Sequence, residues 1–241
     1  MVDFHTHILP GIDDGSTNAT ESLKMLRMLE EQGIKKVVLT PHFYAYSSDV
    51  EQFNKNRESS LEKLLEELGK TPVNIELYLG CEVLYFDELW RIEGLSEFCI
   101  KGTDCIIVEM PFSEWTDSVV GGVEKLISKG LTPIIAHFER YLKYKGNEEK
   151  IYELVAMGAV LQVNCECFNK FFKRRKALGY LRKGYICAMG SDCHNLLDRA
   201  PNCKVAYDLI RKKLGKREYT ELIARQNLLL KNAYKVFPVN K

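Results

Sequence analysis

Short apolar runs alternate with amphipathic segments along the whole chain, and this alternation constrains the fold more than any other feature. The runs occupy residues 2–7, 35–42, 74–83, 104–111, 132–140, 159–166 and 185–194. Segments with helical periodicity follow most of them, from residue 18 onward and then at about 50–69, 117–130, 147–157, 169–183, 202–214 and 218–233. Apolar strands that alternate with helices form parallel sheets covered by those helices. The pattern therefore predicts an α/β fold, either an open sheet or a closed barrel.

The first helical segment carries its own start and stop signals. Asn18 is a good N-cap residue, Glu21 stands three residues later as a capping partner, and Gly33 is a typical stop. Leucines recur on one stripe of this segment: Leu23, Leu26 and Leu29. These signals predict an amphipathic helix that packs its leucine stripe against the sheet.

Composition indicates one globular domain over residues 1–241, with 46% apolar and 28% charged residues. The net charge of +1 gives no general attraction to nucleic acid or to anionic membranes. No apolar run approaches the ~18 residues of a membrane span, and the chain begins with a strand pattern rather than a signal sequence. We therefore expect a cytoplasmic protein with no membrane span and no nucleic-acid partner.

Eight cysteines lie mostly singly in apolar runs such as DCIIVEM and YICAMG, without C-x-x-C pairs. This usage predicts buried, reduced thiols rather than disulfides or a zinc knuckle. The turn PGIDDG after the first run lacks both glycine-rich phosphate-binding patterns, which argues against a nucleotide site.

The positions of the histidines indicate a metal site. All five lie at the carboxyl ends of predicted strands: His5, His7, His42, His137 and His194. Carboxylates occupy equivalent places or the loop after the first strand: Glu82, Glu109, Asp192, Asp13 and Asp14. In a parallel α/β barrel the carboxyl ends of the strands form a single face, so these side chains would gather at one mouth.

Metal ions would make such a gathering stable. Five imidazoles and several carboxylates in one concavity would otherwise suffer like-charge repulsion and desolvation. Nitrogen and oxygen ligands without thiolate suit zinc, manganese or iron, and so many ligands imply two or three divalent ions. Each residue taken singly also has an ordinary explanation as a turn, cap or ion-pair residue, so the prediction rests on their joint placement.

Six motifs together resemble the PHP (polymerase and histidinol phosphatase) superfamily. They are D-F-H-T-H at 3–7, L-T-P-H at 39–42, G-C-E-V at 80–83, V-E-M-P at 108–111, A-H-F-E-R-Y at 136–141 and G-S-D-C-H-N at 190–195. More narrowly, H-I-L-P-G-I-D-D-G, H-F-E-R-Y and S-D-C-H-N-L-L-D-R-A-P are similar to bacterial PHP-type protein-tyrosine phosphatases of capsule and exopolysaccharide operons. The family's usual A-H-P-E-R-Y has phenylalanine in place of proline here, which should alter the stiffness of the loop more than its chemistry.

The resemblance implies a distorted (β/α)7 TIM-like barrel, the PHP fold, as a single phosphoesterase domain over 1–241. It also implies a cytoplasmic metal-dependent phosphatase that hydrolyses phosphotyrosine with a metal-bound hydroxide. The implied ions are manganese first, with iron or zinc as alternatives. The implied protein substrate is a bacterial tyrosine autokinase of capsular or exopolysaccharide synthesis.

By similarity, three ions would share nine ligands. The first ion would be held by His5, His7, Glu82 and Asp192. Glu82 would bridge to a second ion held also by Glu109 and His137, and the third would be held by Asp14, His42 and His194. Many PHP phosphoesterases have histidine at the positions of Glu109 or Asp14, which leaves the partition among the ions open.

Four further residues are candidates for substrate contacts. Arg140 and Arg199 follow the fifth and seventh predicted strands and would bind phosphate oxygens, although a surface salt bridge is an equally ordinary role for each. Phe43 and Tyr44 follow His42 and would form a rim that stacks on the tyrosine ring, although aromatic residues there more often serve in packing.

Two other features invite functional interpretation and are better explained otherwise. Cys193 and Arg199 match the C-x5-R spacing of cysteine-dependent phosphatases, but the intervening loop has no glycine to turn its amides onto a phosphate. The basic run K-F-F-K-R-R-K at 170–176 is best explained as a solvated helix face.

Three other functions stay open on the sequence. The main alternative is a small-molecule phosphomonoesterase, such as a histidinol-phosphate phosphatase, on the same metal site. An amidohydrolase-like enzyme is another, but we find no lysine at a strand end to bridge its metals. A non-catalytic relative that has lost its metals is a third, and the intact ligand set argues against it.

Overall fold

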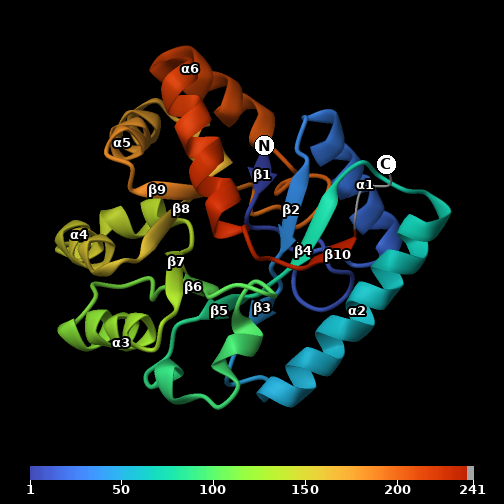
Figure 1. Ribbon diagram of the computed structural model, residues 1–241, viewed down its shortest axis with the longest axis horizontal. Helices are drawn as coiled ribbons and strands as arrows, with labels where there is room; N and C mark the ends of the chain where they lie inside the picture. Colours follow the sequence, from blue (N-terminus) through green and yellow to red (C-terminus); the bar gives the residue numbers. More distant parts are fainter. Residues whose placement is uncertain (238–241) are drawn as a thin grey trace.

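The structure, a computed structural model, describes residues 1–237 and shows a ring of strands surrounded by helices (Figure 1). The strands are β1 (Val2–Asp3), β2 (Lys36–Leu39), β3 (His42–Phe43), β4 (Glu76–Leu79), β5 (Glu82–Leu84), β6 (Cys105–Glu109), β7 (Thr132–Ile135), β8 (Val160–Asn164), β9 (Ile186–Gly190) and β10 (Lys235–Phe237). They form two hydrogen-bonded ladders, ordered β1-β2-β4-β10 and β3-β5-β6-β7-β8-β9. Neighbours are parallel, except that β10 runs antiparallel to β4.

The two ladders are parts of one continuous sheet. Lys36 pairs with Glu76 in the first ladder and His42 pairs with Glu82 in the second, so the register between the two segments does not change. Between the ladders, Gly80 N donates to Leu39 O at 2.9 Å and Glu82 N donates to Pro41 O at 2.9 Å. Segments 36–43 and 76–84 are therefore two interrupted strands, each crossing both ladders.

The sheet closes on itself between the first strand and the last parallel strand. Phe4 N donates to Met189 O at 2.8 Å, Asp192 N to His5 O at 2.8 Å and His7 N to Cys193 O at 2.9 Å. Ser191 N also donates to the buried carboxylate of Asp3 at 2.9 Å. With this seam made, seven parallel strands form a distorted barrel, which confirms the predicted fold.

Inward-facing positions explain how the barrel carries a polar site above an apolar floor. Val38, Tyr78, Ile107, Ile134 and Ala188 belong to one buried cluster that fills the barrel. A second and larger cluster lies between the strands and the helices. Because successive strand residues point to opposite faces, both faces are apolar here, as the uninterrupted apolar runs of the sequence require.

The polar site is built from the same inward faces, further along the strands. His42 lies four residues after Val38, Glu82 four after Tyr78 and Glu109 two after Ile107. Even spacing keeps these side chains on the inward face, at the carboxyl end of each strand.

The helices follow the predicted order. They are α1 (Ala19–Glu31), α2 (Val50–Lys70), α3 (Asp117–Ser128), α4 (Asn147–Met157), α5 (Phe171–Arg182) and α6 (Cys203–Leu229). The Asn18 side chain accepts from Glu21 N at 3.0 Å, the three leucines of the stripe are buried, and Gly33 has φ of +81°. The two helices predicted over 202–214 and 218–233 are the two arms of α6, which kinks at Gly215 (φ +89°, ψ 175°).

The predicted strand over 132–140 is wrong in its second half. β7 ends at Ile135, and a 3₁₀ segment, η3 (Phe138–Lys143), follows directly. His137 has φ of +30°, a left-handed conformation that no extended strand contains. The early turn places Arg140 over the barrel mouth instead of on its wall.

All eight cysteines are free, and seven of them are buried, as the sequence predicted. No helix in the described part of the chain combines the length and the apolar character that crossing a membrane requires.

Candidate metal centre

The nine predicted ligands meet at the mouth of the barrel. Three groups of side chains have potential ligand atoms within 4.8 Å of one another. They are His5, His7 and Asp192; His42, Glu82 and Glu109; and His7, Asp14, His42 and His194. His7 and His42 each belong to two groups, so these eight residues form one continuous centre. His137, the ninth, joins it with Nε2 3.0 Å from Glu82 Oε1 and 3.3 Å from Glu109 Oε1.

Glu82 lies in the middle of this centre. Its Oε2 is 3.0 Å from His5 Nε2, 3.4 Å from His7 Nε2 and 3.1 Å from His42 Nδ1. Its Oε1 is 3.0 Å from His137 Nε2. A fully buried carboxylate that faces four imidazoles is placed to bridge ions, and these histidines hold the pKa of Glu82 well below its usual value although burial alone would raise it.

The two flanks of the centre differ in exposure. On one flank, His137 Nε2 is 3.3 Å from Glu109 Oε1, and both residues are buried. On the other, Asp14 Oδ1 is 3.4 Å from His194 Nε2 and 3.6 Å from His42 Nε2, while the Asp14 side chain is 64% exposed. Asp14 therefore closes the solvent side of the cluster.

Unpartnered polar atoms show that this donor set fits divalent cations. Buried polar atoms are nearly always hydrogen-bonded. Among residues 1–237, however, His42 Nδ1, Glu82 Oε2 and His194 Nε2 are buried and make no hydrogen bond of normal geometry, although other ligand atoms lie close to them. His5 Nε2 and His7 Nε2 also face each other at 3.1 Å. Cations between such atoms would satisfy them, and imidazole nitrogen with carboxylate oxygen is a ligand set that manganese, iron and zinc share.

Asp13 supports the centre from behind, a role that the sequence prediction did not assign. Its carboxylate is 2.8 Å from His7 Nδ1 and accepts a hydrogen bond from His42 N at 3.0 Å. Burial alone would raise the pKa of Asp13, but the contact with His7 and the hydrogen bonds from His42 N and Gly15 N together outweigh burial and lower the pKa to about 2. Outer carboxylates that orient ligand histidines in this way are common around metals.

Gln162 is a second supporting residue that sequence reasoning missed. Its Oε1 is 3.1 Å from His5 Nδ1 and accepts from His137 N at 2.6 Å. Its Nε2 donates to Asn164 Oδ1 at 3.0 Å, and Asn164 Nδ2 donates to Asp192 Oδ2 at 2.8 Å. The sequence does carry a pattern that predicts this residue. L-Q-V-N at 161–164 alternates apolar and polar residues at the end of a strand whose other face is buried, which indicates that Gln162 and Asn164 share a face.

Tyr141 completes the support on the opposite side. Its hydroxyl is 3.2 Å from His137 Nδ1 and accepts a hydrogen bond from Met110 N at 2.9 Å. His137 is thereby oriented with Nε2 toward the carboxylates. Burial raises the pKa of Tyr141 well above its usual value, which keeps the phenol neutral.

Both predicted arginines lie at the centre and both bind Asp192. Arg140 Nη2 is 2.5 Å from Asp192 Oδ2, and Arg199 Nη2 is 2.7 Å from Asp192 Oδ1. Their side chains are about one-third exposed, at 35% and 39%, so each guanidinium has one side toward solvent. Asp192 itself has φ of +54°, a strained conformation for a residue other than glycine.

The predicted aromatic rim is wrong for Phe43. That side chain is only 2% exposed and packs in the core against Phe53 and Phe98, with ring centroids 5.1 Å and 4.4 Å away. It points away from the mouth because it alternates with His42 along β3.

Tyr44 does lie at the mouth. Its ring stacks on His42 at 4.9 Å and on the exposed Tyr46 at 5.3 Å, and it lines a cavity of about 410 Å³ with Asp14 and His42. On the opposite side, the half-exposed Phe112 stacks on His137 at 5.9 Å, a placement that we did not predict.

Cys193 is not placed to act as a nucleophile. The residue is fully buried, and burial raises the pKa of its thiol well above the usual value. Its neighbours Asp192 and His194 reach the centre while Cys193 lies in the hydrophobic layer behind it.

Comparison with known proteins agrees with this geometry. The model of the family described as capsular polysaccharide synthesis, CpsB/CapC, matches residues 1–237. The chain is 29% identical over 234 residues to the tyrosine-protein phosphatase CpsB of Streptococcus pneumoniae, covering 92% of this chain and 94% of that protein. It is 29% identical over 244 residues to the tyrosine-protein phosphatase YwqE of Bacillus subtilis, covering 96% and 92%.

A solved structure is similar over the full length of both chains. It comes from crystal structures of YwqE from Bacillus subtilis and CpsB from Streptococcus pneumoniae, described as unique metal-dependent tyrosine phosphatases. The TM-score is 0.85, the sequence identity is 26%, and 100% of each chain is covered. On the family match over nearly all of its length, the chain belongs to the capsular polysaccharide synthesis CpsB/CapC family.

Proposed function

We propose that this chain is a metal-dependent protein-tyrosine phosphatase. Its substrate would be a phosphorylated bacterial tyrosine kinase of capsular or exopolysaccharide synthesis, encountered in the cytoplasm. The observation that carries the proposal is the continuous centre of nine histidine, aspartate and glutamate side chains with two arginines at its edge. The family match over 1–237 further supports a single phosphoesterase domain.

We assign the ligand roles by geometry. His5, His7 and Asp192 would hold one ion, Glu109 and His137 a second, and Asp14, His42 and His194 a third, with Glu82 shared among them. When bound, two or three divalent cations would activate water as the nucleophile and neutralise the phosphate oxygens. Manganese is our first choice, with iron or zinc as alternatives.

The protein's own side chains would position the phosphate. Arg140 and Arg199 share the two oxygens of Asp192, and Arg199 Nη1 also lies 3.9 Å from Asp14 Oδ2. Because about a third of each arginine side chain is exposed, its guanidinium group could also donate to an arriving phosphate. Phosphoryl transfer places negative charge on the equatorial oxygens, so two preorganised guanidinium groups would stabilise the transition state.

The two aromatic side chains would flank the phenyl ring of the substrate. Tyr44 stands over His42 and Phe112 over His137, so the centre lies between two rings that are partly open to solvent. The phenol leaves with a pKa near ~10, which reduces the need for a strong general acid.

The test is hydrolysis of a phosphotyrosine peptide by chelator-stripped protein with manganese, zinc, iron or magnesium added back. We expect activity to return with manganese, to survive Cys193→Ser, and to fall at least 100-fold in His42→Ala and Arg140→Ala. The assignment would be refuted if the protein does not hydrolyse the phosphotyrosine peptide but, with the same metal, hydrolyses histidinol phosphate or similar small phosphate esters. That result would establish the small-molecule phosphomonoesterase instead.

A further inference from the structure

Helix α5 and the residue on either side of it carry a concentration of positive charge. Seven basic residues and no acidic ones lie between Lys170 and Lys183, whereas the whole chain has a net charge of only +1. Two large apolar side chains stand at the start of the helix, with Phe171 64% exposed and Phe172 85% exposed. Exposed apolar residues amid like charges are unfavourable in isolation, so this surface is suited to a partner.

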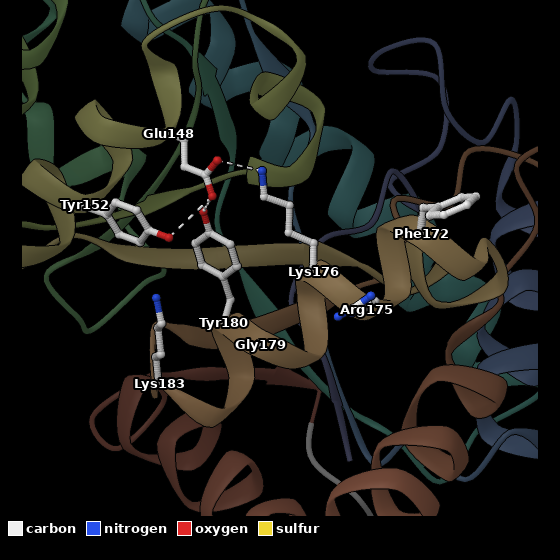
Figure 2. Close-up of a pocket in the computed structure, with 8 residues that line it drawn as sticks. All are labelled: Glu148, Tyr152, Phe172, Arg175, Lys176, Gly179, Tyr180 and Lys183. Carbon is white, nitrogen blue, oxygen red and sulfur yellow. Dashed lines mark hydrogen bonds and ion pairs between the residues drawn. The ribbon is translucent and has the colours of Figure 1, made fainter.

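Intramolecular contacts neutralise only part of this charge. Lys170 pairs with Glu166 at 2.8 Å, and Lys176 reaches across to Glu148 of α4 at 2.7 Å (Figure 2). Within residues 1–237, Lys173 and Arg175 have no acidic partner within 4.0 Å, and both side chains are exposed. Two cations thus remain available on the same turns of α5 as Phe172.

A groove separates this surface from η3, the 3₁₀ segment that directly follows the candidate ligand His137. It has a volume of about 280 Å³, with Phe138, Glu139, Leu142 and Lys143 of η3 on one side and Phe172, Lys173, Lys176 and Ala177 of α5 on the other. Three lysines against one glutamate leave the lining of the groove positive. Phe138 directly follows His137 in the chain, and Arg140 belongs to the same 3₁₀ segment. A peptide whose phosphate lies on Arg140 would therefore have its neighbouring residues beside this groove.

We propose that this groove, the η3–α5 groove, docks an acidic segment next to the phosphotyrosine of a protein substrate. An apolar side chain of that segment would lie against Phe172, and its carboxylates would pair with Lys173 in the groove and with Arg175, which lines the neighbouring pocket that Phe172 and Lys176 share with the groove. The proposal rests on the proposed phosphatase function and adds the sequence context that the enzyme would prefer.

The shape of the surface favours a peptide over a lipid membrane. Phe171 is covered on one face by Arg174, whose guanidinium carbon lies 5.3 Å from the ring centroid. Of the two exposed phenylalanines, Phe172 lines the groove and Phe171 does not. A concave groove suits a single side chain better than a flat bilayer surface.

Kinetics with matched substrates test the proposal. The substrates are p-nitrophenyl phosphate, a phosphotyrosine peptide flanked by acidic and apolar residues, and the same peptide with lysines in place of the acidic residues. We expect Phe172→Ala to raise KM for the acidic peptide about fivefold, and Lys173→Glu/Arg175→Glu to raise it at least tenfold. In both variants kcat, and all constants for p-nitrophenyl phosphate, should stay unchanged.

A matched control separates local contacts from overall charge. Lys24→Glu/Lys63→Glu makes the same change in net charge on α1 and α2, where both side chains are exposed, and should leave KM for every substrate unchanged. An equal rise in KM in this control, or equal KM values for the acidic and lysine peptides with the native enzyme, would overturn the proposal.

Direct binding keeps the two proposals distinguishable. Fluorescence anisotropy with the unphosphorylated acidic peptide measures docking without catalysis. If the protein binds this peptide but has no phosphatase activity, the proposed function is refuted and the docking proposal stands. Sedimentation with phosphatidylglycerol vesicles tests the membrane. Vesicle binding that requires Phe172, together with no peptide binding, would refute peptide docking and assign the surface to lipid.

Discussion

Replacing Gln162 by leucine removes a residue that supports the metal centre and leaves every candidate ligand in place. The variant should therefore show how much the supporting hydrogen bonds contribute to stability and to metal affinity. Leucine has a similar size, but it cannot serve the three partners that Gln162 contacts within the barrel. His5 Nδ1, His137 N and Asn164 Oδ1 would each lose a hydrogen bond of 2.6–3.1 Å. None of these atoms reaches solvent easily, because all three residues are buried.

The expected loss of stability follows from these three contacts. An unpaired buried donor or acceptor costs about 1–3 kcal/mol, so three would cost about 3–9 kcal/mol before relaxation. Burying the leucine side chain recovers about 2 kcal/mol. With rearrangement of the partners we expect a net loss of about 2–5 kcal/mol, which lowers Tm by roughly 5–15 °C in a chain of this size.

Thermal unfolding of metal-free protein, followed by circular dichroism, measures this loss without any contribution from bound ions. Metal affinity by chelator competition should fall about 10–100-fold, because His5 loses the partner that orients it. Gln226→Leu is the matched control, since it removes another buried glutamine, whose side chain bonds Tyr207 and no other residue in the described part of the chain. This variant should lower Tm without changing metal affinity. A Gln162→Leu variant within 2 °C of the native Tm, or with native metal affinity, would refute the reasoning.

Three further outcomes are expected. Gly190→Ala places a Cβ 2.5 Å from His5 Cβ and should weaken both metal binding and stability, whereas Gly121→Ala, with open space around its Cβ, should raise Tm slightly. Cys193→Ser should retain most phosphatase activity, and a complete loss measured at equal metal content would revive a thiolate mechanism. Asp13→Asn should destabilise metal-free protein by about 2 kcal/mol above pH 4, because the pKa of Asp13 in the folded protein, about 2, lies below the usual 3.8. The difference in unfolding free energy between the variant and the native protein should shrink as the pH falls from about 4 through 2. Urea unfolding at pH 7 and pH 3 measures it, and a pH-independent difference would contradict the ion-pair explanation.

The gathering of the ligand residues could be predicted from the sequence because the carboxyl ends of all strands in a parallel barrel lie at one face, independently of how the core packs. His42 and Glu82 could be placed from the alternation of their strands alone, and the closure of the barrel then brings His5 beside them. The capping of the first helix by Asn18 was equally local, so the sequence sufficed for it.

Other features depend on contacts between distant segments and could not be predicted from local patterns. Phe43 was placed at the mouth because it adjoins His42, but strand alternation turns it into the core. Phe112 reaches His137 only because the loop after β6 folds over η3, and no periodicity encodes that contact. The pairing of both arginines with Asp192 likewise depends on two loops that are far apart in the chain.

The seam between the first strand and β9 has a consequence for folding. The hydrogen bond from Ser191 to Asp3 joins residues 188 positions apart, so the seam forms only after nearly the whole chain has collapsed. His5 and His7 lie on one side of it and Asp192 on the other. An ion held by all three would join the two sides of the seam. Its binding free energy would then add to the free energy needed for local unfolding of the seam. Amide hydrogens of residues 4–7 and 189–193 should therefore exchange faster when the metal is removed, well before the rest of the barrel loosens.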